Sequence, residues 1–220
     1  MIAPGHAKAS ANDLKGAIAD YNEAIKLDPN LAIAYYNRGF CLKGLGKVSE
    51  AIVDYSEAIR LNPKYKEAVN SRGVAKNSLD DYESAIADFT FIIRGIDSIY
   101  KYALSNRGWT YMQANKYLEA IHDLNSCIRS NPRYPPAYLN RGFLMIRLHA
   151  YENSILDFTI LTLLEPNNSS AYANRGFAKY NLKRYSEALE DFSKAISLDE
   201  KKRLRLQYGS ICKLLHARGN

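Results

Sequence analysis

The tetrapeptide NRGF occurs three times in this chain, at Asn37–Phe40, Asn140–Phe143 and Asn174–Phe177. Two variants stand in the gap between the first two copies: SRGV at Ser71–Val74 and NRGW at Asn106–Trp109. The arginines of the five copies are separated by 34, 35, 34 and 34 residues. A fixed period of this length predicts a protein built by stacking one structural module.

Each period contains two helical patterns. The segment AYYNRGFCLKGLG is followed by KVSEAIVDYSEAIRLNP, in which apolar residues recur at steps of one, three and four, as on one face of a helix. Pro63 ends this second pattern. Between the two patterns, Gly46 can take the left-handed conformation that a tight turn needs. Each unit is therefore predicted to be a helix, a turn and a second helix.

A glycine recurs inside the first helix of every period: Gly39, Gly73, Gly108, Gly142 and Gly176. A glycine in an exposed helix costs about 1 kcal/mol relative to alanine. Five in register indicate that two helices approach each other closely there.

These features resemble the tetratricopeptide repeat family. Its pattern has a glycine in the first helix, then an alanine, an aromatic residue four positions later and a closing proline, here Gly39, Ala51, Tyr55 and Pro63. The resemblance implies an all-α fold, a right-handed superhelical α-solenoid of about five complete helix-turn-helix repeats. One departure is systematic: arginine precedes every glycine, where the family usually has leucine.

We expect a single domain over residues 1–220. Its units are predicted at about 1–31, 32–65, 66–100, 101–134, 135–168 and 169–200. The first unit is truncated, because Pro4 restricts its first helix to about residues 4–10. An apolar stripe at helical spacing predicts a C-terminal capping helix over 201–217.

An aspartate stands 16 residues after each arginine of the set. The arginines are Arg38, Arg72, Arg107, Arg141 and Arg175, and the aspartates are Asp54, Asp88, Asp123, Asp157 and Asp191. This recurrence predicts structural ion pairs between packed helices; the alternative is a role in binding a ligand. Asp20 lies one period before Asp54, so we hypothesise that the pairs join successive units, with Asp20 the partner of Arg38.

The resemblance also implies that the first helices line the concave side, which binds a peptide or a protein segment. The predicted groove residues are Asn37, Phe40, Lys43, Asn106, Trp109, Asn140, Phe143, Asn174 and Phe177. An amide both donates and accepts, so a ladder of asparagines can hold a peptide backbone, while aromatic rings bury its apolar side chains. The alternative is that these rings pack between neighbouring first helices. Tyr36 and Phe40 stand where a clamp for acidic chaperone tails would need lysine and asparagine.

Several functional classes are disfavoured. The chain has no stretch of 18 apolar residues and no secretory signal, which favours a cytoplasmic protein without a membrane span. No nucleophile–base group, metal-ligand spacing or cofactor motif emerges, so we predict no catalysis, no metal site and no cofactor.

Charge leaves a second interpretation open. Residues 201–220 carry six basic and no acidic residues, and account for most of the net charge of +7. Because this charge is concentrated at one end instead of along a stripe, nucleic acid is a disfavoured partner. The alternative is a repeat segment of a larger enzyme or assembly, such as a glycosyltransferase arm or an RNA-associated complex, with a basic C-terminal contact. The incomplete N-terminal repeat could also pair with a second copy.

Overall fold

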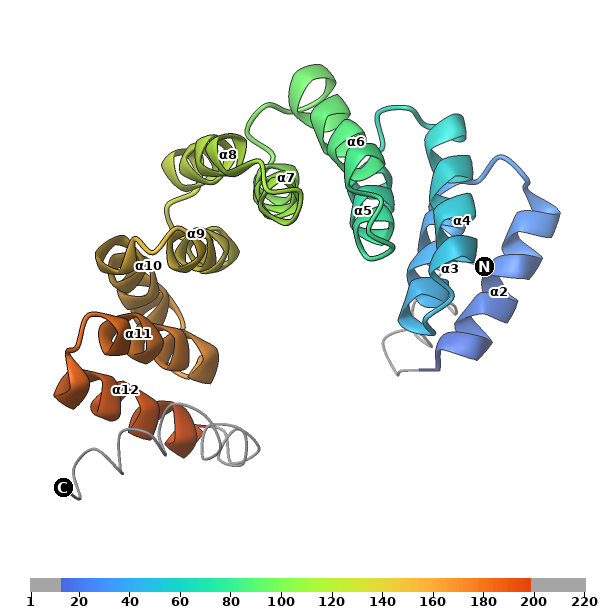
Figure 1. The fold of residues 1–220 in the computed structure, drawn as a ribbon. Helices are drawn as coiled ribbons and strands as arrows, with labels where there is room; N and C mark the ends of the chain where they lie inside the picture. Colours follow the sequence, from blue (N-terminus) through green and yellow to red (C-terminus); the bar gives the residue numbers. More distant parts are fainter. Residues whose placement is uncertain (1–12, 199–220) are drawn as a thin grey trace. The chain divides into compact units, whose positions relative to one another are not determined.

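A computed structural model describes residues 13–198, and within this range every regular element is an α-helix (Figure 1). The eleven helices of this range are α2 (Leu14–Leu27), α3 (Ala32–Gly44), α4 (Val48–Leu61), α5 (Lys66–Asn77), α6 (Tyr82–Gly95), α7 (Lys101–Gln113), α8 (Tyr117–Ser130), α9 (Pro135–Arg147), α10 (Tyr151–Leu164), α11 (Ser169–Asn181) and α12 (Tyr185–Leu198). The helix-turn-helix prediction is confirmed. The helix predicted near residues 4–10 and the capping helix at 201–217 lie outside the described residues.

The chain divides into two compact units, residues 1–116 and 117–220. In the first unit, each helix from α2 to α7 packs on the next, and α5 also contacts both α3 and α7. In the second unit, helices α8 to α12 likewise pack in sequence order. The single domain over 1–220 stays a prediction.

The recurring glycine makes room for an aromatic ring of the helix that follows it. A Cβ atom built on Gly73 would lie 2.7 Å from Cε1 of Phe89, a fully buried side chain of α6. The same approach recurs for three pairs: Gly39 with Tyr55 at 2.9 Å, Gly142 with Phe158 at 2.8 Å, and Gly176 with Phe192 at 3.0 Å. The glycine is therefore fixed by packing within one helical pair.

The turn inside each pair needs a left-handed residue. Gly46 has φ +79°, as its sequence predicts. The same position in the later periods is also left-handed but carries no glycine: Asp80 (φ 59°), Asn115 (58°), His149 (57°) and Lys183 (61°). The backbone geometry of the turn is thus more regular than its sequence, because the left-handed region is accessible to other residues at a modest cost.

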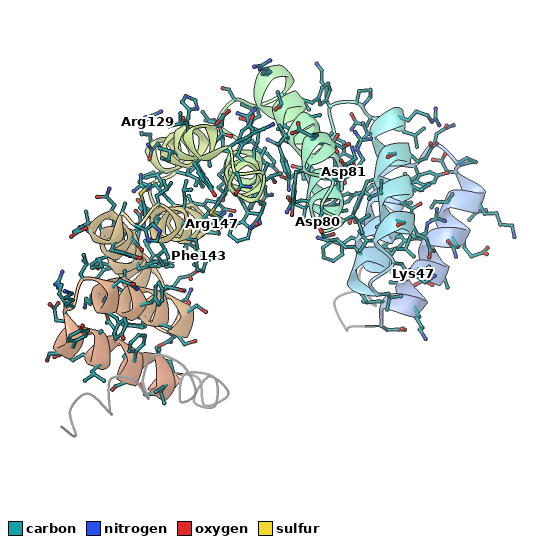
Figure 2. The ribbon with its side chains drawn as sticks, viewed as in Figure 1. Lys47, Asp80, Asp81, Arg129, Phe143 and Arg147 are labelled. Carbon is teal, nitrogen blue, oxygen red and sulfur yellow. The ribbon has the colours of Figure 1, made fainter. Side chains whose placement is uncertain are left out.

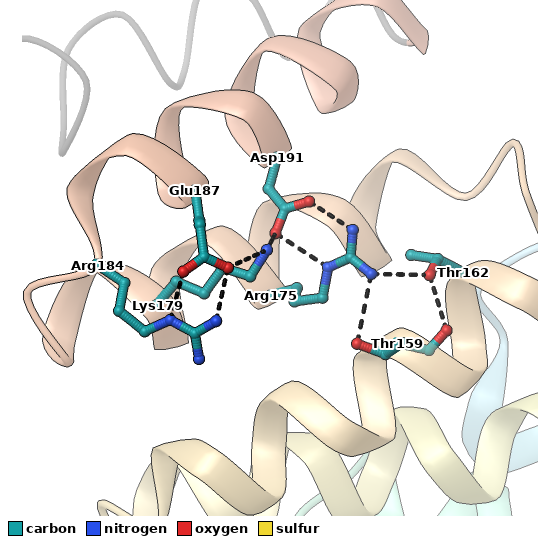
Figure 3. A network of polar contacts seen from close by, with 7 residues as sticks. All are labelled: Thr159, Thr162, Arg175, Lys179, Arg184, Glu187 and Asp191. Carbon is teal, nitrogen blue, oxygen red and sulfur yellow. Dashed lines mark hydrogen bonds and ion pairs between the residues drawn. The ribbon is translucent and has the colours of Figure 1, made fainter.

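The arginine before the glycine joins three helices, as Figure 3 shows for Arg175. Its Nε donates to Asp191 Oδ2 at 2.9 Å and its Nη2 donates to Asp191 Oδ1 at 2.6 Å, so it forms a bidentate ion pair with α12. Its Nη1 points the other way, to Thr162 Oγ1 on α10 at 3.1 Å and to Thr159 Oγ1 at 3.4 Å. One guanidinium therefore closes its own helical pair and contacts the preceding pair.

The same arrangement recurs along both units. Three more ion pairs have Nη2–Oδ1 distances of 2.6 Å: Arg38 with Asp54, Arg72 with Asp88, and Arg141 with Asp157. The Nη1 atoms donate to the preceding second helix, from Arg38 to Asn22 (2.8 Å), Arg72 to Ser56 (3.2 Å), Arg107 to Thr90 (2.9 Å) and Arg141 to Asn125 (2.6 Å). Each of these partners stands two residues after an aspartate of the set.

The hypothesis of ion pairs between successive units is therefore wrong for Arg38, Arg72, Arg141 and Arg175. The aspartate partner belongs to the same helix-turn-helix repeat as the arginine. Arg38 bonds Asp54 and Asn22 instead of Asp20. The reason is geometric: the second helix runs back along the first, which brings the residue 16 positions later alongside the arginine. The contact of each arginine with the preceding repeat goes to an uncharged side chain.

Asp157 lies in an environment that disfavours its charged form. Asp157 is 2% exposed, and burial raises the pKa of its carboxyl, while the bond from Arg141 opposes that rise. Removing one partner of a buried ion pair leaves the other charge uncompensated.

We predict that Gly73→Ala destabilises the protein by about 1 to 3 kcal/mol, because its Cβ would overlap the Phe89 ring. The matched control is Gly95→Ala at the end of α6, where an added Cβ meets nothing within 4 Å, so the free energy of unfolding should stay the same or rise slightly. Urea unfolding followed by circular dichroism measures both. Equal effects of the two substitutions would contradict the packing explanation.

Arg141→Met is expected to cost about 3 to 5 kcal/mol, because Asp157 would be left buried and unpaired. Adding Asp157→Leu to this variant should recover most of the loss. Arg129→Met is the control, since Arg129 is exposed on α8 and donates only to Ser126 among the described contacts. The same urea experiment applies, and a double variant no more stable than Arg141→Met would show that the paired charges do not account for the cost.

Candidate functional site

Five of the predicted groove residues lie on the first helices of the first unit. Asn37, Phe40 and Lys43 are on α3, and Asn106 and Trp109 are on α7, with α5 contacting both helices. We call this surface the first-helix face of unit 1.

An amide pair links two helices of this face. Asn106 Nδ2 on α7 donates to Asn70 Oδ1 on α5 at 3.1 Å. The sequence prediction included Asn106 but missed Asn70. In the period of Asn70 the position equivalent to Asn106 is occupied by Ser71, and Asn70 stands one residue before it. On the same helix, Asn77 Oδ1 is buried and has no hydrogen-bond partner within the described residues.

The side chains contributed by α3 differ in exposure. Phe40 is 59% exposed, although it is a large apolar ring, while Asn37 is only 9% exposed. Lys43 is half-buried, and burial lowers the pKa of its ammonium because loss of water disfavours the charged form. A ligand that covers α3 can bury the exposed ring of Phe40 and form an ion pair with the partly desolvated ammonium of Lys43.

The four other predicted groove residues lie in the second unit, Asn140 and Phe143 on α9 and Asn174 and Phe177 on α11. The Phe143 ring, labelled in Figure 2, packs edge-on against Phe158 of α10, with ring centroids 5.8 Å apart. Asn174 Nδ2 donates to Ser170 O of its own helix at 2.7 Å. Phe177 is 37% exposed. In this unit Phe143 is committed to internal packing and Phe177 is accessible.

The nine predicted residues thus divide between two units, five in the first and four in the second. The continuous ladder of asparagines stays a prediction. The amide pair of Asn106 and Asn70 joins two first helices within the first unit.

Residues 13–198 contain no group of three or more His, Cys, Asp or Glu side chains placed to hold a metal ion. In the same range no helix is long and apolar enough to cross a bilayer. Cys41 and Cys127 are buried and form no disulfide within residues 13–198, and burial raises the pKa of the Cys41 thiol.

Family models match the chain in several places. A model described as TPR repeat matches residues 5–46, one described as tetratricopeptide repeat matches 32–65 and 169–202, and a further tetratricopeptide repeat model matches 102–134. Together these matches cover more than half of the chain.

Solved structures give the same fold at low sequence identity. A structure described as the functional characterization of pilF from Pseudomonas aeruginosa has a TM-score of 0.76 at 17% identity, covering 100% of this chain and 96% of its own. A tetratricopeptide repeat protein from Parabacteroides merdae has a TM-score of 0.75 at 21% identity, over 90% of this chain and 78% of its own.

A third structure is YrrB, described as a TPR protein with an unusual peptide-binding site. It has a TM-score of 0.61 at 20% identity, over 91% of this chain and 98% of its own. A search of curated protein sequences gives no significant match. The recurring glycine and aromatic pairs, the helical hairpins and the family models agree that this chain belongs to the tetratricopeptide repeat family.

Proposed function

We propose that this protein is a non-enzymatic scaffold that binds an extended peptide or protein segment on the first-helix face of unit 1. Tetratricopeptide repeat proteins are generally interaction scaffolds without catalytic activity. The observation that carries the proposal is the exposure of Phe40, which presents a large ring to solvent although the next two residues of its helix, Cys41 and Leu42, are buried.

The chemistry of this face suits a peptide backbone. The amides of Asn70 and Asn106 satisfy each other with one hydrogen bond, which leaves each with further donor or acceptor capacity. Aromatic rings contribute large contact areas at low entropic cost, because they have few rotatable bonds. Phe40 and Trp109 occupy the same position of their periods and supply such rings.

Lys43 adds a preference for an acidic residue in the ligand. A half-buried ammonium regains favourable interactions when a carboxylate approaches it. The bound segment should therefore combine an apolar or aromatic side chain with a nearby acidic one. YrrB has a peptide-binding site on a similar fold, which supports the class of ligand but not the residues involved.

Trp109 provides a direct assay, since it is the only tryptophan of the chain. Linear random dodecamer peptides displayed on phage would be selected on the full-length protein, and the enriched peptides synthesised and titrated against Trp109 fluorescence. We expect saturable changes in emission, and Phe40→Ala should weaken binding at least about tenfold because it removes an exposed aromatic anchor.

Phe91→Ala is the matched control. Phe91 is 50% exposed in the same unit, but it lies on the second helix α6. This variant should bind the selected peptides as the unchanged protein does. Equal losses in both variants, or enriched peptides that leave Trp109 emission unchanged, would contradict binding on the first-helix face.

A further inference from the structure

The second helix α10 carries an apolar ridge on its exposed side. Leu156 and Leu163 are 63% and 76% exposed, and the partly buried Ile160 lies between them at helical spacing. No charged residue occurs between Asp157 and Glu165. We call Leu156, Ile160 and Leu163 the α10 ridge.

The other repeats show that this ridge is a departure from the usual sequence. The position of Leu163, six residues after the aspartate, is basic in the four preceding periods: Lys26, Arg60, Arg94 and Arg129. The position of Ile160 is acidic in two of them, and there the two side chains pair, Arg60 with Glu57 at 2.6 Å and Lys26 with Glu23 at 4.0 Å. In α10 a solvated ion pair is replaced by two apolar residues.

Internal packing explains Ile160, which packs against the core beside Phe158, but it does not explain Leu156 and Leu163, which lie mostly outside the core. A helix that is apolar on all sides is normally covered by another surface. The ridge therefore indicates a contact with another molecule.

A complementary surface lies in the first unit. Helices α2, α3 and α4 enclose an open depression of about 590 Å³, whose apolar lining includes Ile18, Leu42, Leu45 and Val53. Lys15 and Lys47 lie at its border, and Figure 2 labels Lys47. Val53 is 67% exposed within it. We call this depression the α2–α4 groove.

The residue at the position of Leu42 varies between repeats. It is lysine in two later periods, where Lys76 reaches Asp88 at 2.9 Å and Lys179 reaches Asp191 at 2.8 Å, and it is Tyr111 and Met145 in the other two. Leu42 itself makes no such ion pair; it packs with Tyr55 in the core of its pair, and its edge lines the groove beside the ion pair of Arg38 and Asp54.

The ridge and the groove match in length and in charge. The groove runs along α2 from Lys15 to Asn22 and the ridge from Leu156 to Leu163, each seven steps or about 10 Å of helix. Among the charged residues that line the groove, Arg38 pairs with Asp54 and Lys47 with Glu50. Within the described part of the chain this leaves Lys15 as the unpaired cation of the lining, and Glu152 and Glu165 flank the ridge. Opposite charges around an apolar contact favour association of these two surfaces.

We propose that the α10 ridge of one copy docks into the α2–α4 groove of a second copy. The two surfaces differ, so the contact is head-to-tail, and each added copy presents a fresh ridge or a fresh groove. The groove shares α3 with the proposed peptide site, but its lining includes neither Phe40 nor Lys43, so association and peptide binding use different side chains.

One substitution tests each side, and each introduces a residue that other repeats carry at the same position, which protects folding. Leu163→Arg introduces the residue found at this position in α4, α6 and α8, and Leu42→Lys introduces the one found in α5 and α11. Sedimentation velocity of the full chain over a range of concentrations should show dimers and larger species. Each variant alone should associate at least about tenfold more weakly, so it should stay monomeric at concentrations at which the unchanged chain forms dimers.

An equimolar mixture of the two variants gives the sharpest result. Leu42→Lys keeps an intact ridge and Leu163→Arg keeps an intact groove, so the mixture should form a one-to-one dimer and nothing larger. A symmetric ridge-to-ridge contact would let Leu42→Lys, whose ridge is intact, dimerise on its own, and that result would overturn the proposal.

Ser197→Arg is the control, because Ser197 occupies the position of Leu163 in α12 and this variant should associate normally. Circular dichroism checks that all variants keep their helix content. A protein that is monomeric at every concentration, or variants that associate as the unchanged chain does, would overturn the proposal. Titration of selected peptides against Trp109 fluorescence should be unaffected by either substitution, which separates this test from that of the peptide site.

Discussion

A buried aspartate in the second helix imposes the main constraint on each helical pair. Asp54, Asp157 and Asp191 are at most 4% exposed, and an unpaired carboxylate at such a position would be strongly destabilising. The arginine of the first helix meets this requirement with two hydrogen bonds at a fixed geometry. This pairing explains why arginine occupies a position where leucine is usual in the family, since leucine could not neutralise the charge.

The planar guanidinium then determines how pairs are joined. Two of its nitrogens bond the aspartate, which directs Nη1 away from its own pair and towards the preceding second helix. The acceptor there needs only an oxygen, and Asn22, Ser56, Thr90 and Asn125 all provide one. An arginine and an aspartate thus recur within each helical pair, whereas the hydrogen bond between neighbouring pairs is accepted by side chains of different size.

This difference decides what the sequence could predict. The glycine, the arginine and the aspartate recur without exception in the five complete periods, so the fold and the existence of the ion pairs follow from their spacing. The sequence did not predict that each ion pair lies within one repeat. A first helix has a second helix on either side, one from its own repeat and one from the preceding repeat, and a recurrence at 16 residues does not distinguish them. Similarly, Gly46 revealed a left-handed turn, but Asp80, Asn115, His149 and Lys183 adopt the same φ without a sequence signal. The exposure of Phe40 and the internal packing of Phe143 also required coordinates, since both stand at the same position of the repeat.

A repeat protein offers its own reference for identifying surfaces with a role beyond folding. Positions that meet the same packing and charge requirements should carry similar residues in every period, so a departure without a packing benefit needs another explanation. Leu163 removes a solvated cation and remains exposed. This change does not improve the core of its own pair, so it does not account for the apolar surface that it creates. The α10 ridge and the α2–α4 groove lie in different compact units, and contact between copies covers both apolar surfaces with one interaction.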